Sequence, residues 1–383
     1  MTRIGQWYTN GILRKNIDRK AKYIWFHAAS LGEFEQGRPM IEMIRVKYPQ
    51  HKILLTFFSP SGYEVRKNYE GADVICYLPF DEPFKVRKFL NLANPHIAIF
   101  IKYEFWLNYL TELKKRDVKI YLISAVFRPN QLFFKWYGRW YRKALECYER
   151  LFVQDEDSKK LLADYGIENV SVCGDTRFDR VLEIQQNARL LPEAELFTRG
   201  NKMILVAGST WPEDEKIIIP YFNSHPEIKL IIAPHEIHRE HLLYIQSLLN
   251  RPSIRLSEID GETIQIYDCL IIDSFGLLSS IYRYGHVAYI GGGFGRGIHN
   301  TLEAAVYGIP VVFGTKFQKF KEAKRLIANG GGFSIDSESA FFEILNQFIT
   351  DHEFCRKAGL IAEDFVYQNA GATEKILQHM DVS

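Results

Sequence analysis

The sequence has few cysteines, no long apolar run and almost no net charge. Its five cysteines are spread along the chain without a Cys-x-x-Cys pair, which argues against a disulfide framework or a zinc site and is typical of a reducing cytoplasm. No window approaches the ~20 apolar residues that cross a bilayer, and no signal peptide is visible. A formal net charge of +2 leaves no broad basic field, so we expect no nucleic-acid partner.

The sequence does contain a repeating alternation of short apolar runs and amphipathic segments. Each run has the length of a strand and is bounded by Gly, Pro, Asn or Asp, which is typical of a parallel sheet with helices on both faces. A first series comprises YIWFHAA, KILLTFF, DVICYLP, HIAIFIKYE, KIYLISAVF, RLFVQ and VSVCGD. A second comprises KMILVAGS, KLIIAPHE, CLIID, HVAYIGGG and IPVVFG.

This pattern divides the chain into five parts. A basic N-terminal segment with little rigid structure is expected at 1–22, a first domain at 23–180, a charged linker at 181–200, a second domain at 201–350 and C-terminal helices at 351–383. The predicted class is α/β, with two Rossmann-like doubly wound domains facing a central cleft. Ligands of such sheets bind beyond the carboxyl ends of the strands, so polar residues at those ends are candidates for the site.

Residues 286–314, HVAYIGGGFGRGIHNTLEAAVYGIPVVFG, join a strand, a glycine loop and a helix that opens at Asn300. Glycines let a ligand approach the backbone, and the first N–H groups of a helix are unpaired, so the stretch predicts a phosphate site. It fits equally well a tight turn in which Asn300 caps the helix and Glu303 completes a capping box. Its GFGRG run would suit a dehydrogenase only if it came in the first βα turn of its domain, and it comes late.

Two carboxylates follow strands of the first domain. Glu33 comes after Ser30 and Gly32 at the start of a helix, where a carboxylate often only complements the helix dipole. Glu104 lies beside aromatic residues, and is as readily an ordinary surface side chain. Because both follow strands of one sheet, we expect a shared site in which a carboxylate acts as a general base.

A segment at 126–148 alternates aromatic and basic residues. Phe133, Trp136 and Trp140 are predicted to share one face of a helix, with Arg128 and Arg139 beside it. Such a stripe usually packs in a core, but it also suits a helix that lies against an anionic membrane surface. Stacking on single-stranded nucleic acid would need a broader basic field.

Two further strand ends carry polar residues in the second half. Ser209 and Thr210 close a glycine-bearing turn before a helix, which suits a phosphate or carboxylate. Pro234, His235 and Glu236 follow the next strand in the sequence HEIHR, whose spacing does not place two imidazoles on one helical face. We therefore expect contacts to a nucleotide there, and no metal.

These motifs, in this order, resemble those of the Kdo transferases, which move 3-deoxy-D-manno-octulosonic acid (Kdo) from CMP-Kdo onto the lipid A precursor in Gram-negative bacteria. The resemblance extends over nearly the whole chain from Tyr23. It rests on HAASLGE at 27–33, YEFW at 103–106, GDTRFD at 174–179, GST at 208–210, APH at 233–235, DSFG at 273–276 and NTLE at 300–303.

The resemblance implies a twin-Rossmann glycosyltransferase of the GT-B type that inverts the anomeric centre and needs no metal or other cofactor. Glu33 would deprotonate the attacking hydroxyl, and Glu104 and Arg177 would stabilise the transition state. The donor CMP-Kdo would be held by residues of the second domain: Ser209, Thr210, Pro234, His235, Glu236, Phe275, Gly276, Leu277, Leu278, Gly293, Asn300, Thr301, Leu302 and Glu303.

The implied acceptor is a lipid A precursor, lipid IVA, at the cytoplasmic face of the inner membrane. The family usually has a hydrophobic N-terminal anchor, and here a short basic segment stands instead. Unless the N-terminus is truncated, membrane contact should therefore come from elsewhere, and the candidates are Arg128, Phe133, Trp136, Arg139 and Trp140.

One site residue and one loop also depart from the family pattern. Arg177 stands where Lys is usual, which keeps the charge but replaces a point charge with a planar fork. Gly276-Leu277-Leu278 lacks the acidic middle residue expected of the nucleotide loop. The alternatives are another two-domain glycosyltransferase or an epimerase that uses a UDP-sugar, and a non-catalytic lipid-binding protein.

Overall fold

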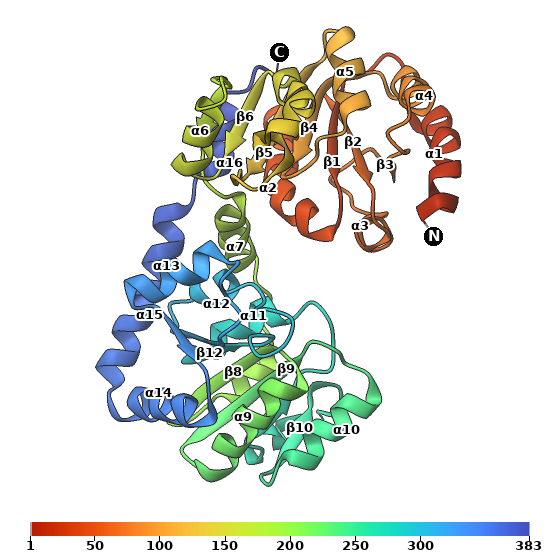
Figure 1. Cartoon of the computed structure of the whole chain (residues 1–383). Coiled ribbons are helices and arrows are strands. Elements are labelled where there is room, and N and C mark those ends of the chain that lie inside the picture. Colours follow the sequence, from red (N-terminus) through yellow and green to blue (C-terminus); the bar gives the residue numbers. More distant parts are fainter. Residues whose placement is uncertain (1, 260, 383) are drawn as a thin grey trace. The chain divides into compact units, whose positions relative to one another are not determined.

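The computed structural model describes residues 2–259 and 261–382. The chain forms two compact units, one of Met1–Arg180 with Asn369–Ser383 and one of Val181–Gln368. Each contains a seven-stranded parallel sheet with helices packed against it (Figure 1). The predicted α/β class with two doubly wound domains is confirmed.

The first sheet has the strand order β3-β2-β1-β4-β5-β6-β7, with parallel neighbours throughout. β1 lies between β2 and β4, so β2 and β3 are added on one side of it and β4 to β7 on the other. Ligands of such sheets bind at the carboxyl ends of the strands where this order reverses. The strands are β1 (Tyr23–Ala28), β2 (Lys52–Phe57), β3 (Val74–Tyr77), β4 (Pro95–Ile101), β5 (Lys119–Ala125), β6 (Arg150–Val153) and β7 (Val170–Val172).

The continuous apolar runs arise because both faces of this sheet are covered. Successive side chains of β1 point to opposite faces, so Trp25 lies in one core cluster and Phe26 in the other. The first unit's helices are α1 (Thr2–Asn16), α2 (Leu31–Lys47), α3 (Pro60–Arg66), α4 (Pro83–Ala93), α5 (Leu107–Lys115), α6 (Glu156–Ala163) and α16 (Ala372–Gln378).

The N-terminal segment differs from its prediction. Residues 2–16 form α1, which packs beside β3 (Figure 1). Leu13 is fully buried, and the Thr9 hydroxyl donates a hydrogen bond of 2.8 Å to the carbonyl of Tyr77. Polar and basic residues dominate this segment, and of the side chains described there only a few, such as Thr9 and Leu13, face inward. The sequence therefore gave no clear signal for a helix packed against the sheet edge.

The second sheet has the order β10-β11-β9-β8-β12-β13-β14, again all parallel. Its strands are β8 (Met203–Thr210), β9 (Ile228–Pro234), β10 (Ser253–Arg255), β11 (Cys269–Ile271), β12 (Val287–Ile290), β13 (Val311–Gly314) and β14 (Gly332–Ile335). The outermost strands β10 and β14 were missed, because they are short and carry polar residues or glycine.

The helices of the second unit vary widely in length. They are α7 (Thr176–Gln186), which starts in the first unit, α8 (Pro192–Phe197), α9 (Pro212–Ser224), α10 (Arg239–Leu248), α11 (Leu278–Ile281), α12 (Leu302–Ala305), α13 (Lys321–Asn329), α14 (Glu338–Thr350) and α15 (His352–Asn369). Among the described residues, no helix combines the length and the apolar character needed to cross a bilayer.

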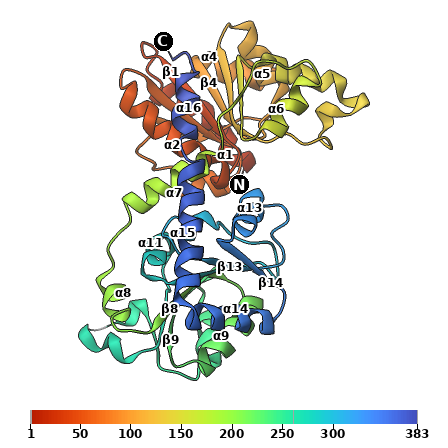
Figure 2. The same ribbon diagram turned by 90° about the vertical axis from the view of Figure 1, so that its left-hand side faces the viewer.

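The division into units places two predicted segments differently. Residues 181–200, expected as a linker, belong to the second unit, where the buried Phe197 of α8 accepts a hydrogen bond from Lys229 through its carbonyl (2.8 Å). The C-terminal helices are shared: α15 belongs mainly to the second unit, and α16 lies beside α2 (Figure 2). The Asp179 carboxylate accepts the Thr373 N–H at 2.6 Å, which ties the start of α16 to the start of α7.

Candidate active site

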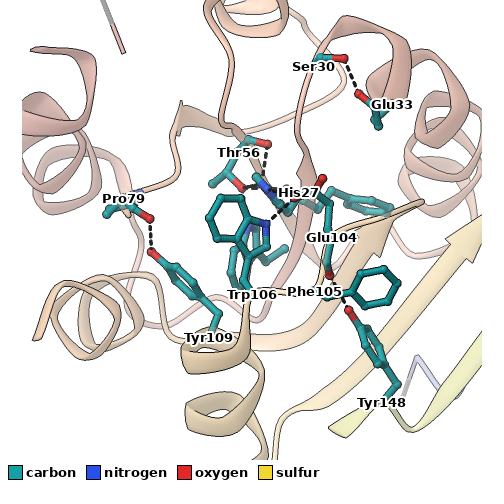
Figure 3. A network of polar contacts seen from close by, with 12 residues as sticks. His27, Ser30, Glu33, Thr56, Pro79, Glu104, Phe105, Trp106, Tyr109 and Tyr148 are labelled. Carbon is teal, nitrogen blue, oxygen red and sulfur yellow. Dashed lines mark hydrogen bonds and ion pairs between the residues drawn. The ribbon is translucent and has the colours of Figure 1, made fainter. Parts of the chain in front are cut away.

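Glu33 and Glu104 follow β1 and β4, which are neighbours in the first sheet (Figure 3). Glu33 lies in the first turn of α2, whose N-cap Ser30 donates its hydroxyl to Glu33 Oε2. Glu33 Oε1 lies 4.0 Å from Lys102 Nζ. The structure therefore gives Glu33 one hydroxyl donor and one nearby cation, and leaves it partly exposed.

Lys102 takes an unusual backbone conformation just beyond β4. Its φ of 72° lies in the left-handed region, which costs a non-glycine residue free energy and is found most often at functional sites. Its N–H donates to the carbonyl of Ile123 on β5 at 2.9 Å, which holds the turn. This turn carries Lys102 toward Glu33 and starts the segment that contains Glu104.

Glu104 is nearly buried, with 8% of its surface exposed. Its Oε2 accepts from the indole N–H of Trp106 and lies 3.1 Å from His27 Nε2. Its carbonyl accepts the Tyr148 hydroxyl at 2.6 Å, so the backbone is fixed as well. Figure 3 shows His27 and Trp106 directed toward the Glu104 carboxylate, and Tyr148 toward the backbone carbonyl.

A cavity of about 540 Å³ opens beside Glu104. Its lining residues include Glu104 and Asp81, and the Asp81 carboxylate accepts the N–H groups of Asn108 and Tyr109 (3.1 and 3.0 Å) at the start of α5. Burial raises the pKa of Asp81. Aromatic rings and carboxylate oxygens together suit a polyhydroxylated ligand, and the rings come from Tyr103, Phe105, Trp106, Trp140 and Tyr141.

Arg177 lies elsewhere in the first unit, in the first turn of α7 beyond β7. Its Nε and Nη2 donate to Asp175 Oδ2 at 2.9 and 2.7 Å. The neighbouring Thr176 hydroxyl donates to the carbonyl of Gln36 at 2.6 Å, which ties this helix start to α2. The planar fork expected from an arginine at this position is thus already engaged with a carboxylate.

The aromatic-basic segment does not form the predicted helix with a single aromatic face. It forms two 3₁₀ helices, Leu132–Phe134 and Trp136–Cys147, separated by Lys135 in an extended conformation (φ −90°, ψ 148°). The break turns Phe133 into the core, where it is 4% exposed, and leaves Trp136 and Trp140 90% and 59% exposed. Phe133 is therefore a core residue and not a surface contact. Arg128 and Arg139 are exposed.

The predicted nucleotide residues follow four adjacent strands of the second sheet. Ser209 and Thr210 end β8; Pro234 ends β9 and is followed by His235 and Glu236; the 275–278 turn follows β11; and Gly293 follows β12. Ser209 has a φ of 53°, a second strained residue at a strand end. The His235 N–H donates to the carbonyl of Thr210 at 2.9 Å, which links the ends of β8 and β9.

The turn after β11 and the segment before α12 hold the remaining predicted residues. Phe275 is exposed, whereas a Cβ added at Gly208 would lie 2.8 Å from Leu278, which places that side chain against β8. Thr301 and Leu302 are buried, and the Thr301 hydroxyl has no protein partner among the described residues.

An N–H group of the glycine loop binds a carboxylate of the protein itself, that of Asp214. The Gly292 N–H donates to Asp214 Oδ2 at 2.8 Å, and the same oxygen accepts the Trp211 N–H at 2.9 Å. The Tyr289 hydroxyl donates to Oδ1 at 2.7 Å. The Gly292 N–H is therefore used by Asp214 and is not available to a phosphate at that position.

Close packing of backbones explains the glycines themselves. A Cβ at Gly291 would lie 2.1 Å from the Ser209 carbonyl oxygen, and one at Gly293 would lie 2.4 Å from the Gly314 nitrogen. The predicted capping box is also altered. Asn300 Oδ1 accepts the Leu302 N–H at 3.2 Å, while its amide donates to the Glu303 carboxylate at 2.9 Å.

Four residues that were not singled out from the sequence surround the predicted ones. The Trp211 ring stacks on His235 (4.6 Å between centroids), and its N–H donates to His299 Nε2 at 3.3 Å. Burial and the nearby His235 lower the pKa of His299 to about 4. The remaining two, Glu215 and His241, are buried and lie 3.0 Å apart.

The Glu215–His241 pair joins two of the predicted strand ends. Glu215 accepts the Thr210 hydroxyl at 2.9 Å, and His241 Nδ1 donates to the carbonyl of Glu236 at 2.8 Å. Burial raises the pKa of Glu215. A cavity of about 590 Å³ beside it is lined by Trp211, Glu236, His238, His241, Arg296 and others. Among the residues that the structure describes, no group of three or more His, Cys, Asp or Glu could hold a metal ion.

Comparisons with known proteins agree with these features. The sequence model of the 3-deoxy-D-manno-octulosonic-acid transferase (Kdotransferase) family matches residues 5–180. The chain is 26% identical over 336 residues to the 3-deoxy-D-manno-octulosonic acid transferase of Aquifex aeolicus, with 85% of this chain and 86% of the relative covered. It is 25% identical over 375 residues to that of Haemophilus influenzae, with 92% and 85% covered.

Solved structures share the fold at lower identity. UDP-GlcNAc 2-epimerase from Neisseria meningitidis matches with a TM-score of 0.65 and 15% identity over 93% of this chain and 98% of its own. A glycosyltransferase from Rickettsia africae matches with a TM-score of 0.60 and 14% identity over 94% and 97%. The two-domain GT-B architecture is thus shared with glycosyltransferases and epimerases alike. Residues 5–180 thus match the Kdotransferase family model, and most of the chain is similar in sequence to 3-deoxy-D-manno-octulosonic acid transferases, which supports its assignment as a glycosyltransferase.

Proposed function

We propose that the chain transfers Kdo from CMP-Kdo to a hydroxyl of a lipid A precursor, with inversion at the anomeric carbon and without a metal. The observation that carries the proposal is the pair of carboxylates, Glu33 and Glu104, at the carboxyl ends of adjacent strands in the domain that the family model matches. Relatives over most of the chain are 3-deoxy-D-manno-octulosonic acid transferases, which supports Kdo as the transferred sugar.

Glu33 is the general base of the proposed reaction. It accepts the proton of the acceptor hydroxyl while that oxygen attacks the anomeric carbon of Kdo from the face opposite the phosphate. The bond from the anomeric carbon to the phosphate oxygen breaks, and CMP leaves with the electron pair. Ser30, which donates to Glu33 Oε2, fixes the carboxylate so that its second oxygen is directed to the substrate.

Glu104 and Arg177 act on the charges that develop in this reaction. Glu104 presents a carboxylate to the cavity of the first unit, where it binds acceptor hydroxyls and favours positive charge at the sugar carbon. The Arg177 side chain is 30% exposed and remains paired with Asp175. It therefore contributes positive charge from a fixed position and does not bind the phosphate through two guanidinium nitrogens.

The second unit holds the nucleotide. His235 and the Asn300–Glu303 pair supply ring and polar contacts for CMP, and Ser209 faces the phosphate at the strained end of β8. Thr210 is buried and its hydroxyl donates to Glu215, so it supports this strand end without contacting the phosphate. Because Asp214 fills the Gly292 site, the phosphate is met by Ser209 and not by the centre of the glycine loop. The charge on the leaving group is met by protein groups, so a chelator should leave the activity unchanged.

The exposed aromatic residues provide contact with the membrane that holds the acceptor. Trp136 and Trp140 stand out from the surface with Arg128 and Arg139 nearby in the sequence, a combination that suits the interface of an anionic bilayer. Trp140 also lines the cavity beside Glu104, which connects the surface to the site.

The direct test mixes the purified chain with CMP-Kdo and a tetraacyl disaccharide bisphosphate. Release of CMP that depends on the acceptor supports the proposal, and absence of release contradicts it. Competition binding separates the UDP-sugar alternative: CMP should displace a labelled cytidine nucleotide at concentrations where UDP does not. Displacement by UDP at lower concentration than CMP would favour a UDP-sugar enzyme.

A further inference from the structure

His27 is a fully buried histidine on β1 that contacts the Glu104 carboxylate from inside the sheet. Its Nδ1 lies 2.9 Å from Thr56 Oγ1 and 3.2 Å from the Thr56 carbonyl oxygen on the neighbouring β2. Thr56 Oγ1 in turn accepts the indole N–H of Trp25 at 2.8 Å. Polar contacts on both sides of the ring therefore fix its orientation (Figure 3).

The His27 and Trp106 contacts to the Glu104 carboxylate are made to the same oxygen. His27 Nε2 lies 3.1 Å from Oε2, and the Trp106 indole also donates to Oε2. Among the described residues, no group donates to Oε1. A hydrogen bond between a ring nitrogen and a carboxylate oxygen needs one proton between them, and His27 supplies it as Nε2–H.

This asymmetry determines which oxygen a ligand can reach. Glu104 lines the 540 Å³ cavity, and its Oε2 is held by the N–H groups of His27 and Trp106. Oε1 is then the oxygen left to accept a hydrogen bond from a hydroxyl in the cavity. A carboxylate held by two donors from rigid neighbours keeps one rotamer and loses little entropy when it binds.

We propose that His27 is a positioning residue, which anchors Glu104 through Oε2 so that Oε1 binds a hydroxyl of the acceptor sugar. The identity of that acceptor rests on the proposed function. His27 itself is out of contact with substrate, since its ring is buried and both nitrogens are used within the protein. Its effect is confined to the first unit, so binding of the nucleotide should not depend on it.

Two substitutions at His27 separate positioning from packing. His27→Phe keeps the ring volume and removes the N–H, and we expect kcat to fall about 100-fold, the effect of a ~1 Å displacement of a reacting group. His27→Gln places an amide N–H close to the position of Nε2 and should recover at least tenfold of that loss. KM for CMP-Kdo and the Kd for CMP should stay within about twofold in both variants. That is well below the tenfold change that ~1.4 kcal/mol produces.

Matched controls identify the cause of any loss. Trp106→Phe removes the other donor to Oε2 and should lower kcat in the same way, whereas His96→Gln, at the amino end of β4, should not. The proposal is overturned if His27→Phe retains kcat within threefold of the wild type, or if His27→Gln is as impaired as His27→Phe while both show wild-type thermal melting.

A second measurement does not depend on activity. Nitrogen-15 spectra of the wild-type His27 ring at pH 7 should show a protonated Nε2, with a shift that changes in Trp106→Phe. An unprotonated Nε2 overturns the proposal. If the wild type transfers no Kdo, the proposed function fails, and the ring spectrum still decides whether His27 anchors Glu104.

Discussion

Removal of the Asp214 side chain should destabilise the second unit strongly. Asp214 is 1% exposed and accepts three hydrogen bonds, from the Tyr289 hydroxyl and from the N–H groups of Trp211 and Gly292. In Asp214→Ala these donors lose their partner, and each buried unpaired group costs roughly 1–3 kcal/mol. We expect a loss of about 3–5 kcal/mol in the free energy of unfolding, because some donors regain water.

Asp214→Asn should lower the free energy of unfolding less than Asp214→Ala does. The amide oxygen can accept both backbone N–H groups, and its NH₂ can donate to Tyr289, whose hydroxyl reverses its role. Burial raises the pKa of Asp214, so the native site penalises the charged form, and the neutral amide avoids that penalty. The expected loss is about 1–2 kcal/mol.

Thermal unfolding checks both values. A loss of ~3 kcal/mol corresponds to a fall of about 10 °C in the Tm of a domain of this size, and hydrogen exchange of the 286–300 peptide assigns the loss to the glycine loop. Asp364→Ala, exposed on α15, is the control and should change stability by less than about 0.5 kcal/mol. An Asp214→Ala variant within ~1 kcal/mol of the wild type, or one no worse than Asp214→Asn, would refute the role given to this carboxylate.

Three further predictions concern the site and the surface. Glu33→Gln should fold and bind CMP but transfer Kdo at least ~100-fold more slowly; retention of near-wild-type kcat would remove Glu33 as the base. The double variant Trp136→Ala/Trp140→Ala should bind anionic vesicles about tenfold more weakly at unchanged stability, whereas Phe133→Ala, in the core, should cost about 3–5 kcal/mol of stability; equal vesicle binding would contradict the first part. The pKa of His299 is lowered from 6.5 to about 4, so the unfolded chain binds a proton more readily between these values and stability should fall as pH decreases from 6.5 to 4. His299→Gln should flatten this part of the stability–pH curve, and an unaltered slope would show that another group causes it.

The architecture could be predicted from the sequence because a doubly covered parallel sheet leaves a direct signal. Each central strand is a continuous apolar run, and the runs repeat with helix-length spacing. The edge strands β10 and β14 lack such runs, and α1 is fixed by few inward-facing residues such as Leu13, so these elements gave no comparable signal.

The site was predictable at the level of strand ends and not at the level of contacts. The rule for α/β sheets brought Glu33 and Glu104 to neighbouring positions. Some of the contacts that shape the two sites join residues far apart in the chain: His27 lies 77 residues before Glu104, and Asp214 lies 78 residues before Gly292. Spacing in a sequence carries no information about such pairs.

In the aromatic segment at 126–148, one extended residue made the helical-face prediction wrong. Phe133 and Trp136 are three positions apart, which places them on one face of a continuous helix. The extended Lys135 between them ends one 3₁₀ helix and starts another, so one ring enters the core and the other enters solvent.

The mass of the acceptor after reaction tests the central claim most directly. The wild type and Glu33→Gln are each incubated with CMP-Kdo and the tetraacyl disaccharide bisphosphate, with and without a chelator, and the lipid is examined by mass spectrometry. We predict that the wild type adds the mass of Kdo in both conditions and that Glu33→Gln leaves the lipid unmodified. An unmodified lipid with the wild type, or equal modification by the variant, would contradict the account.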